Sequence, residues 1–187
     1  IDVHINCIVK KSHNRVSLIY RGFVTRDTRI LQKAYITYVR PILEYCSHVW
    51  SPMYVKYIDA IEKVQKRFTK RLPGMQDLSY LERLAILEWD SLELRRLKSD
   101  LYLYYSIYKQ NSSIDRDEYF QLNPCLRTTR STNECNFVKQ FSHCDVFTNS
   151  FFNRHVDAWN SLPADLRCTN SLASFKRRIN SVNFLHF

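Results

Sequence analysis

Glycine and proline are scarce in this chain of 187 residues, which contains only two glycines and five prolines. Folds rich in β-turns need many of these two residues, because glycine and proline adopt the backbone angles of tight turns most easily. The scarcity therefore argues against a β-sandwich and favours helices joined by few, short connections. It also excludes the glycine-rich loops with which many nucleotide-binding enzymes hold phosphates.

Long hydrophobic runs are missing as well. The chain has no stretch of about 18 consecutive apolar residues, the length that a membrane-spanning helix requires. Its beginning shows neither the basic segment nor the apolar block of a secretory signal, and no initiator methionine. Hydrophobic residues still make up 45% of the chain, enough for a substantial core. We therefore expect an intracellular protein, or a piece of one, with no membrane partner.

The six cysteines, at positions 7, 46, 125, 135, 144 and 168, form no Cys-x-x-Cys pair. Zinc sites usually take their ligands as close pairs, since a tight turn then sets two of the four tetrahedral positions. A site built from Cys125, Cys135, His143 and Cys144 is the alternative, although adjacent side chains cannot easily face one ion. We expect reduced thiols, no metal centre and no cofactor in this chain.

Recognisable catalytic motifs are also lacking. No HExxH motif occurs, and no nucleophile lies in a glycine-bounded elbow. Two-metal phosphoryl transfer needs clustered carboxylates, whereas the carboxylates here are scattered or lie at predicted helix ends. A Cys–His pair from distant positions is the remaining enzymatic alternative, and we expect no catalytic residue.

Positive charge is concentrated in the first 74 residues. The whole chain has 28 Lys and Arg against 18 Asp and Glu, a net charge of +10. Residues 1–74 hold 14 of these basic residues and 5 acidic ones, which gives +9, while residues 75–118 sum to −3 and residues 119–187 to +4. Such asymmetry is typical of proteins that bind a polyanion.

Hydrophobic periodicity predicts a mainly α fold, a bundle of about six or seven helices. The expected helices cover residues 3–22, 27–50, 52–72, 80–87, 91–109, 149–160 and 171–181. We expect Pro41 to kink or break the second helix, Ser51 and Pro52 to begin the third, and Ser79 with Glu82 to form a capping box. Residues 111–147 lack periodicity and form an irregular segment, in which 126–129 and 137–141 suit a short β-ribbon. The expected parts are thus a helical domain over 1–110, the irregular segment 111–147 and a C-terminal helical extension over 148–187.

The helix predicted over 52–72 has one apolar and one basic face. At 100° per residue its apolar side chains fall within about 80°, and five basic side chains centre about 150° away. The apolar residues are Tyr57, Ile61, Val64, Phe68 and Leu72; the basic ridge consists of Lys63, Lys66, Arg67, Lys70 and Arg71. Such a ridge can neutralise phosphates and release their counterions, which predicts salt-dependent nucleic-acid binding. The alternative is an ordinary solvated face.

Other candidate residues give weaker signals. Arg95, Arg96 and Lys98 form a secondary basic cluster, and Lys176, Arg177 and Arg178 form another. Tyr102, Tyr104, Tyr105 and Tyr108 are candidates for stacking on bases, but two of them share a stripe with Leu97 and Leu101, which favours core packing. We interpret Trp50, Trp89 and Trp159 as packing anchors at helix ends.

An ordered series of phrases covers almost the whole chain. The phrases are Tyr38-Val-Arg-Pro-Ile-Leu-Glu-Tyr-Cys-Ser-His-Val-Trp-Ser-Pro52, Ile61-Glu-Lys-Val-Gln-Lys-Arg67, Leu78-Ser-Tyr-Leu-Glu-Arg-Leu84, Ser91-Leu-Glu-Leu-Arg-Arg-Leu97 and Trp159-Asn-Ser-Leu-Pro163. In this order they resemble the region after the catalytic palm in reverse transcriptases of LINE-type (non-LTR) retrotransposons, in the jockey-like and chicken-repeat-like branches. The succession is specific, although no single phrase is.

The resemblance implies a thumb-like helical region and C-terminal extension of an RNA-directed DNA polymerase that carries out target-primed reverse transcription. The implied partners are an RNA–DNA or DNA duplex, the element RNA, and the palm and fingers of the parent polymerase, in nucleus and cytoplasm. The family's Tyr/Phe-Ala-Asp-Asp metal motif and its endonuclease are absent here. Mg²⁺ is therefore implied only for the absent palm, and this transposable-element fragment is expected to be inactive alone. The alternative is a helical protein-interaction module, or a decayed element fragment without activity.

Overall fold

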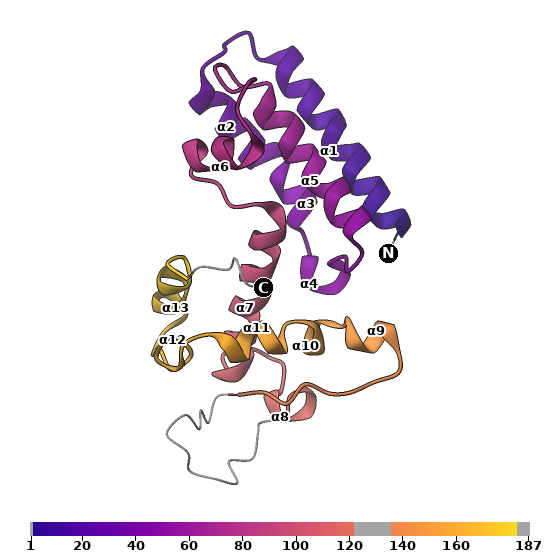
Figure 1. The fold of residues 1–187 in the computed structure, drawn as a ribbon, viewed down its shortest axis with the longest axis vertical. Helices are drawn as coiled ribbons and strands as arrows, with labels where there is room; N and C mark the ends of the chain where they lie inside the picture. The colour runs from indigo at the N-terminus through magenta and orange to yellow at the C-terminus, as the bar shows by residue number, and fades with distance from the viewer. Residues whose placement is uncertain (1, 122–135, 183–187) are drawn as a thin grey trace. The chain divides into compact units, whose positions relative to one another are not determined.

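The computed structural model describes residues 2–121 and 136–182, and in these residues the chain is mainly α-helical. It divides into two compact units, Ile1–Arg96 (unit 1) and Leu97–Phe187 (unit 2), and the division falls within helix α7, Leu92–Tyr108. Unit 1 contains α1 (Asp2–Gly22), α2 (Thr28–Tyr38), α3 (Arg40–Glu44), α4 (Ser47–Trp50), α5 (Val55–Lys70) and α6 (Tyr80–Leu87) (Figure 1). Unit 2 contains α8 (Arg116–Tyr119), α9 (Asp145–Thr148), α10 (Phe151–Arg154), α11 (Val156–Ser161), α12 (Ala164–Arg167) and α13 (Leu172–Ile179). No helix within these residues combines the length and the hydrophobicity that a membrane-spanning segment needs.

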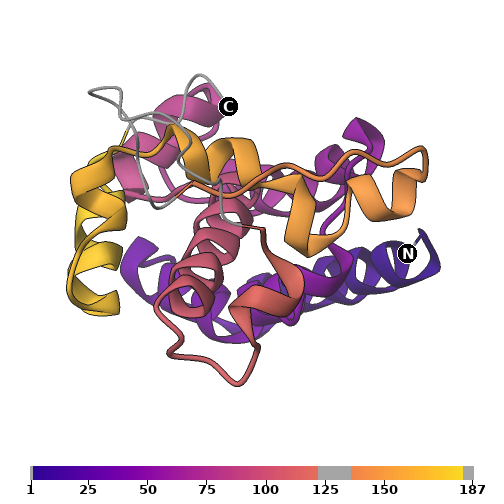
Figure 2. The ribbon, with the colours of Figure 1, turned by 90° about the horizontal axis from the view of Figure 1, so that it is seen from below.

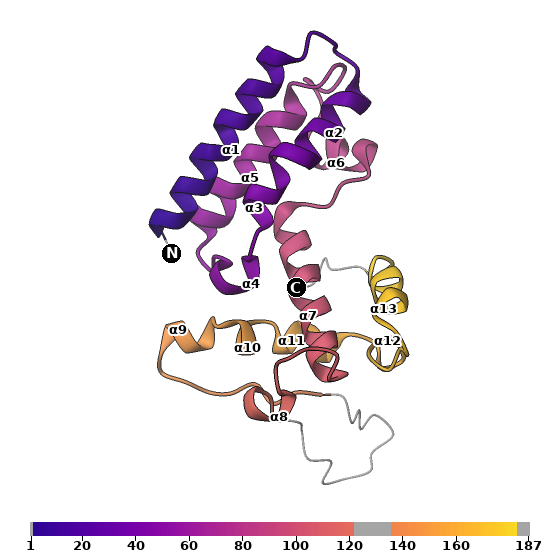
Figure 3. The same ribbon diagram turned by 180° about the vertical axis from the view of Figure 1, so that it is seen from behind.

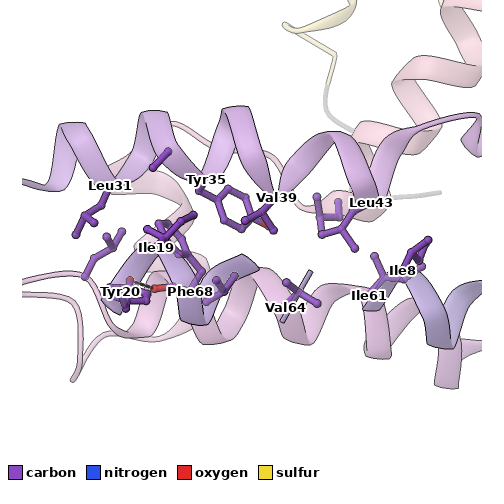
Figure 4. Close-up of a cluster of buried hydrophobic side chains, with 14 of the residues drawn as sticks. Ile8, Ile19, Tyr20, Leu31, Tyr35, Val39, Leu43, Ile61, Val64 and Phe68 are labelled. Atoms are coloured by element: carbon purple, nitrogen blue, oxygen red, sulfur yellow. Dashed lines mark hydrogen bonds between the residues drawn. The ribbon is translucent and has the colours of Figure 1, made fainter. Parts of the chain in front are cut away.

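Helices α1 and α5 lie side by side and run in the same direction, with α2 and α3 packed along them (Figures 1 and 3). Their ends are joined where the Tyr20 hydroxyl near the end of α1 donates to the Phe68 carbonyl of α5 at 2.8 Å. Buried side chains from all four helices point into the space between them (Figure 4). Unit 1 is therefore organised around α5.

The apolar face predicted for α5 is confirmed. Ile61, Val64 and Phe68 are fully buried, and so is Leu72 just beyond the helix. The Phe68 ring stacks on Tyr35 of α2 with a centroid distance of 4.5 Å. The burial of these side chains removes one whole face of α5 from water, which leaves the opposite face as its solvent surface.

The helix predicted over 27–50 is interrupted, as Pro41 suggested, but at two places. Helix α2 ends at Tyr38, and Pro41 lies in the first turn of α3, where its missing N–H costs no hydrogen bond. The second interruption, at Cys46, was not expected. The backbone there takes the left-handed conformation, φ 52°, before α4 begins. Non-glycine residues enter this region only at some cost, so surrounding contacts must hold it.

The predicted helix start at Ser51 and Pro52 is wrong, because α5 begins three residues later, at Val55. The Ser51 N–H donates to the Ser47 carbonyl at 2.8 Å, so Ser51 ends α4 instead of capping the next helix. The carbonyl of Tyr54 accepts the first N–H groups of α5, from Tyr57 at 2.9 Å and Ile58 at 3.2 Å.

The start of α6 matches its prediction. Ser79 Oγ accepts from the Glu82 N–H at 3.3 Å, and the Glu82 carboxylate accepts from the Ser79 N–H at 2.7 Å. These two bonds make the expected capping box. Hydrogen bonding of the Glu82 carboxylate to the Ser79 side chain, and then to the Ser79 backbone, lowers the pKa of Glu82, because it favours the charged form. Helix α7 begins in a related way, with Ser91 Oγ accepting from the Leu94 N–H at 3.1 Å.

Unit 2 has a core made largely of aromatic rings. Tyr104 and Tyr105 are fully buried, and their hydroxyls donate to the carbonyls of Phe151 at 2.7 Å and Thr169 at 2.6 Å. Trp159 is also fully buried. These tyrosines therefore pack in the core, as their stripe indicated, and their faces are not available to nucleobases.

Two asparagines hold the segment that enters α9. Asn160 binds the Phe137 backbone through both its amide atoms, at 3.0 and 2.8 Å, and Asn153 binds the Gln140 backbone in the same way. The segment runs opposite to α10 and α11 (Figure 2). Asn153 and Asn160 are seven residues apart in a helical region, and Phe137 and Gln140 are three residues apart in an extended segment. Both intervals span about 10 Å, so each asparagine can reach its partner.

The clamped segment is one half of the expected ribbon. Within 137–141, Phe137 takes part in an isolated β-bridge, the Val138 N–H donates to the Gln121 carbonyl at 2.8 Å, and asparagine side chains bind the backbone of Phe137 and Gln140. Residues 126–129 lie outside the described residues, so a ribbon between 126–129 and 137–141 stays a prediction. The helix predicted over 149–160 is also divided, at His155, into α10 and α11.

Candidate nucleic-acid interface

The basic ridge lies on the solvent side of α5, opposite the core. Lys63, Arg67, Lys70 and Arg71 are exposed and Lys66 is half-buried. The ridge therefore exists as a surface and consists of the five residues expected from the sequence. Its members differ in how free they are to bind another molecule.

A straight row of three lysines runs along the centre of this face. Lys56, Lys63 and Lys70 are spaced seven residues apart, so they fall within about 40° of one another and about 10.5 Å apart along the axis. We call these three residues the lysine line. All are exposed, and in the described part of the chain neither Lys63 nor Lys70 has an ion-pair partner. Lys56 was missed in the sequence, although its seven-residue spacing was the available signal.

The flanking cations are more constrained. The Arg71 guanidinium lies 4.0 Å from the ring centroid of Tyr20, an arrangement typical of cation–π contacts. On the other flank Lys66 Nζ lies 3.9 Å from the carboxylate of Asp59 and 5.4 Å from the ring centroid of Tyr80. Lys63 and Lys70 of the lysine line are thus less engaged by neighbouring side chains than Lys66 and Arg71 are.

Glu62 does not neutralise the ridge, because it is buried on the other side of α5. Its carboxylate accepts from the Leu92 N–H at 3.0 and 3.2 Å, and from the Tyr80 hydroxyl. A carboxylate at a helix N-terminus also interacts favourably with the helix dipole, so Glu62 anchors the start of α7. Burial, followed by the Glu62 charge, raises the pKa of Tyr80 and keeps its hydroxyl a donor.

Gln65 completes this support. Its amide accepts from the Tyr35 hydroxyl at 3.3 Å and donates to the Tyr80 hydroxyl and the Asp90 carbonyl, both at 3.0 Å. The buried side of α5 is thereby tied to α2, α6 and the start of α7. A helix held at so many points presents its outer lysines on a fixed backbone.

His13 of α1 adds a titratable group beside the ridge. Its pKa is lowered by burial and then by the positive charge of Arg67, because both disfavour the imidazolium. The unfolded chain therefore binds this proton more tightly than the folded chain does. The free energy of unfolding should consequently fall as the pH drops below the ordinary histidine value of 6.5.

Urea unfolding at about pH 5 and about pH 7.5 measures this effect. The His13→Gln variant should show a smaller loss of stability on acidification than the wild type. The matched control is His143→Gln, at an exposed position, which should keep the wild-type pH dependence. Equal acid sensitivity of the wild type and His13→Gln would contradict the assignment.

The secondary basic cluster does not form a surface ridge. Arg95 forms an ion pair with Glu44 of α3, and Arg96 and Lys98 are buried, with 3% and 7% of their surface exposed. In α13, Lys176 lies 5.2 Å from the ring of Tyr102, and Arg178 pairs with Asp165. These residues are involved in packing and pairing within the chain.

The described ranges contain no arrangement of side chains that suits a metal ion. Cys125 and Cys135 of the alternative zinc site lie outside those ranges, and within them no group of three His, Cys, Asp or Glu side chains is placed to hold an ion. The buried carboxylate of Asp100 accepts from Arg154 Nη2 at 2.6 Å and lies 3.0 Å from His155 Nε2, so it is fully engaged. The feature that the described residues do present is the charged surface of α5.

No family model, curated protein or solved structure matches this chain.

Proposed function

We propose that the chain binds a nucleic-acid duplex without catalysing a reaction on it, as a thumb-like part and C-terminal extension of a LINE-type reverse transcriptase. The observation that carries the proposal is the lysine line, an exposed row of cations on a helix whose other face is buried. The resemblance of the ordered sequence phrases to that family supports the same function. The palm and fingers of the parent polymerase would supply the chemistry.

The dimensions of the lysine line suit a duplex. From Lys56 to Lys70 it extends about 21 Å, at 1.5 Å per residue. A duplex carries one phosphate charge per about 1.7 Å of its axis, so phosphates are available along the whole length of the line. Lysine offers a point charge and no planar pair of donors, hence it positions the duplex and does not read its sequence.

Salt dependence tests the proposal directly. The affinity for a labelled RNA–DNA primer–template, measured by fluorescence anisotropy between about 50 and 200 mM salt, should fall steeply. Three to five phosphate contacts predict a slope of log affinity against log salt of about −3 to −4.5. Unlabelled duplexes of unrelated sequence should compete equally well. Absence of binding at low salt, or a slope near zero, would refute the function.

A second candidate, a protein-interaction module, is favoured by one observation. Leu81 and Ile86 of α6 are 77% and 59% exposed, although α6 also buries an inner face in unit 1. An exposed apolar surface of this kind suits a protein partner, and such binding would depend little on salt. The Leu81→Ser and Ile86→Ser pair distinguishes the two candidates, since it should leave duplex affinity unchanged.

A further inference from the structure

Large apolar side chains are exposed just before the lysine line begins. Tyr45, Val49, Tyr54 and Val55 have 77%, 82%, 56% and 71% of their surface exposed, and Met53 has 42%. Single exposed apolar residues are ordinary, but five within eleven consecutive positions are an unusual concentration. We call these five residues the 45–55 patch.

The backbone beneath the 45–55 patch is held in place. Trp50 is buried, its indole Nε1 donates to the Tyr45 carbonyl at 2.7 Å, and its ring lies 5.3 Å from His4 of α1. At the other end the Tyr54 carbonyl anchors the first turn of α5. The backbone that carries the patch is therefore tied to α1 and α5, which lowers the entropy lost when a ligand binds.

The patch is continuous with the lysine line. Lys56 follows Tyr54 and Val55 directly, and its Nζ lies 4.5 Å from the centroid of the Tyr57 ring. The rings of Tyr54 and Tyr57 are 6.4 Å apart in an edge-to-face arrangement. The exposed ring of Tyr54 thus lies near Lys56, the first cation of the lysine line. Proteins bind single-stranded nucleic acid with this combination of aromatic rings and positive charge.

We propose that an unpaired nucleobase at the end of a duplex stacks on Tyr54, while the lysine line holds the paired part. The inference rests on the proposed function, since it extends the same interface. Stacking needs only the flat face of a base, so the site accepts any base sequence. A tyrosine ring also suits this role because few rotatable bonds are immobilised when a base covers it.

Abasic nucleotides separate stacking from charge, because they keep the phosphates and remove the bases. The wild type is tested against one duplex with a base-bearing extension of about four nucleotides and against the same duplex with an abasic extension. The base-bearing ligand should bind about 10-fold more tightly, since stacking on an aromatic ring stabilises each bound base. Tyr54→Ala should lose this advantage, and Tyr54→Phe should keep it.

Tyr38→Ala is the matched control, because Tyr38 is 54% exposed and stands outside the 45–55 patch. It should retain the preference for the base-bearing ligand. Circular dichroism of each variant checks that the fold is kept. If the wild type binds both extensions equally while duplex binding stays salt-dependent, stacking is overturned and the lysine line survives. If no ligand binds at all, the proposed function itself fails.

Discussion

Reversing the charge of the lysine line should remove most of the affinity for duplex. In the variant Lys56→Glu, Lys63→Glu, Lys70→Glu, three phosphate contacts are lost, and each contributes a slope of about 0.9. The slope of log affinity against log salt should therefore flatten by about 2.7, and affinity near 0.1 M salt should fall by about 100-fold or more. The measurement is anisotropy with the RNA–DNA primer–template over a salt series.

This variant tests phosphate binding more specifically than a variant that includes Lys66. Lys66 lies close to Asp59 and to the Tyr80 ring, so its reversal would also disturb contacts within unit 1. Lys63 and Lys70 are exposed, and Lys56 interacts chiefly with the neighbouring Tyr57 side chain and more weakly with the charge of Asp2. The triple variant is consequently expected to unfold at the same urea concentration as the wild type.

A charge-matched control separates the effect of the lysine line on affinity from the effect of the protein's net charge. The variant Lys11→Glu, Arg15→Glu, Lys33→Glu changes exposed residues of α1 and α2. Each reversal removes two charges, so both triple variants lower the net charge by six, from +10 to +4. The control should lose much less affinity. An equal loss in both variants would mean that net charge alone drives binding, and would count against the lysine line.

Truncating Phe68 to alanine should destabilise unit 1 by about 3–5 kcal/mol, the usual cost for a fully buried phenylalanine. The ring is fully enclosed and stacks on Tyr35 and Trp89 at 4.5 and 6.2 Å, so its removal leaves a cavity that rigid aromatic neighbours cannot fill. Urea unfolding followed by circular dichroism and tryptophan fluorescence gives the free energy of unfolding.

The comparison variant is Phe141→Ala, at a phenylalanine that is 85% exposed, where a change within about 0.5 kcal/mol is expected. Phe68 and the lysine line occupy opposite faces of α5. Phe68→Ala should therefore keep the wild-type salt slope under conditions in which it is still folded. A loss below about 1 kcal/mol would show that the rings repack around the missing side chain.

Local patterns in the sequence predicted a large part of the fold. The helical class, the capping box of Ser79 and Glu82 and the apolar face of α5 all follow from spacings of three to four residues along one helix. The same periodicity places Lys63 and Lys70 on the exposed face of α5. Such features depend on neighbours in the chain, so they are readable without knowledge of what packs against them.

Other features depend on residues far apart in the sequence. Glu62 precedes Lys63 directly in the sequence, yet its partners Tyr80 and Leu92 lie 18 and 30 residues away and draw it into the interior. Arg95 looked like a surface cation, but Glu44, 51 residues earlier, pairs with it. A charged residue can be solvated or paired at the same helical position, and only the neighbouring element decides between the two.

The sequence by itself thus determined that the chain is mainly helical and which face of α5 carries positive charge, because periodicity and charge are properties of the chain alone. It did not predict the short helices α8, α9 and α12. Tertiary structure decided where α5 begins, how the backbone turns at Cys46, and which of the cations remain free to meet a phosphate. The physical reason is that burial and pairing are set by contacts between elements, whose energies appear only when those elements meet.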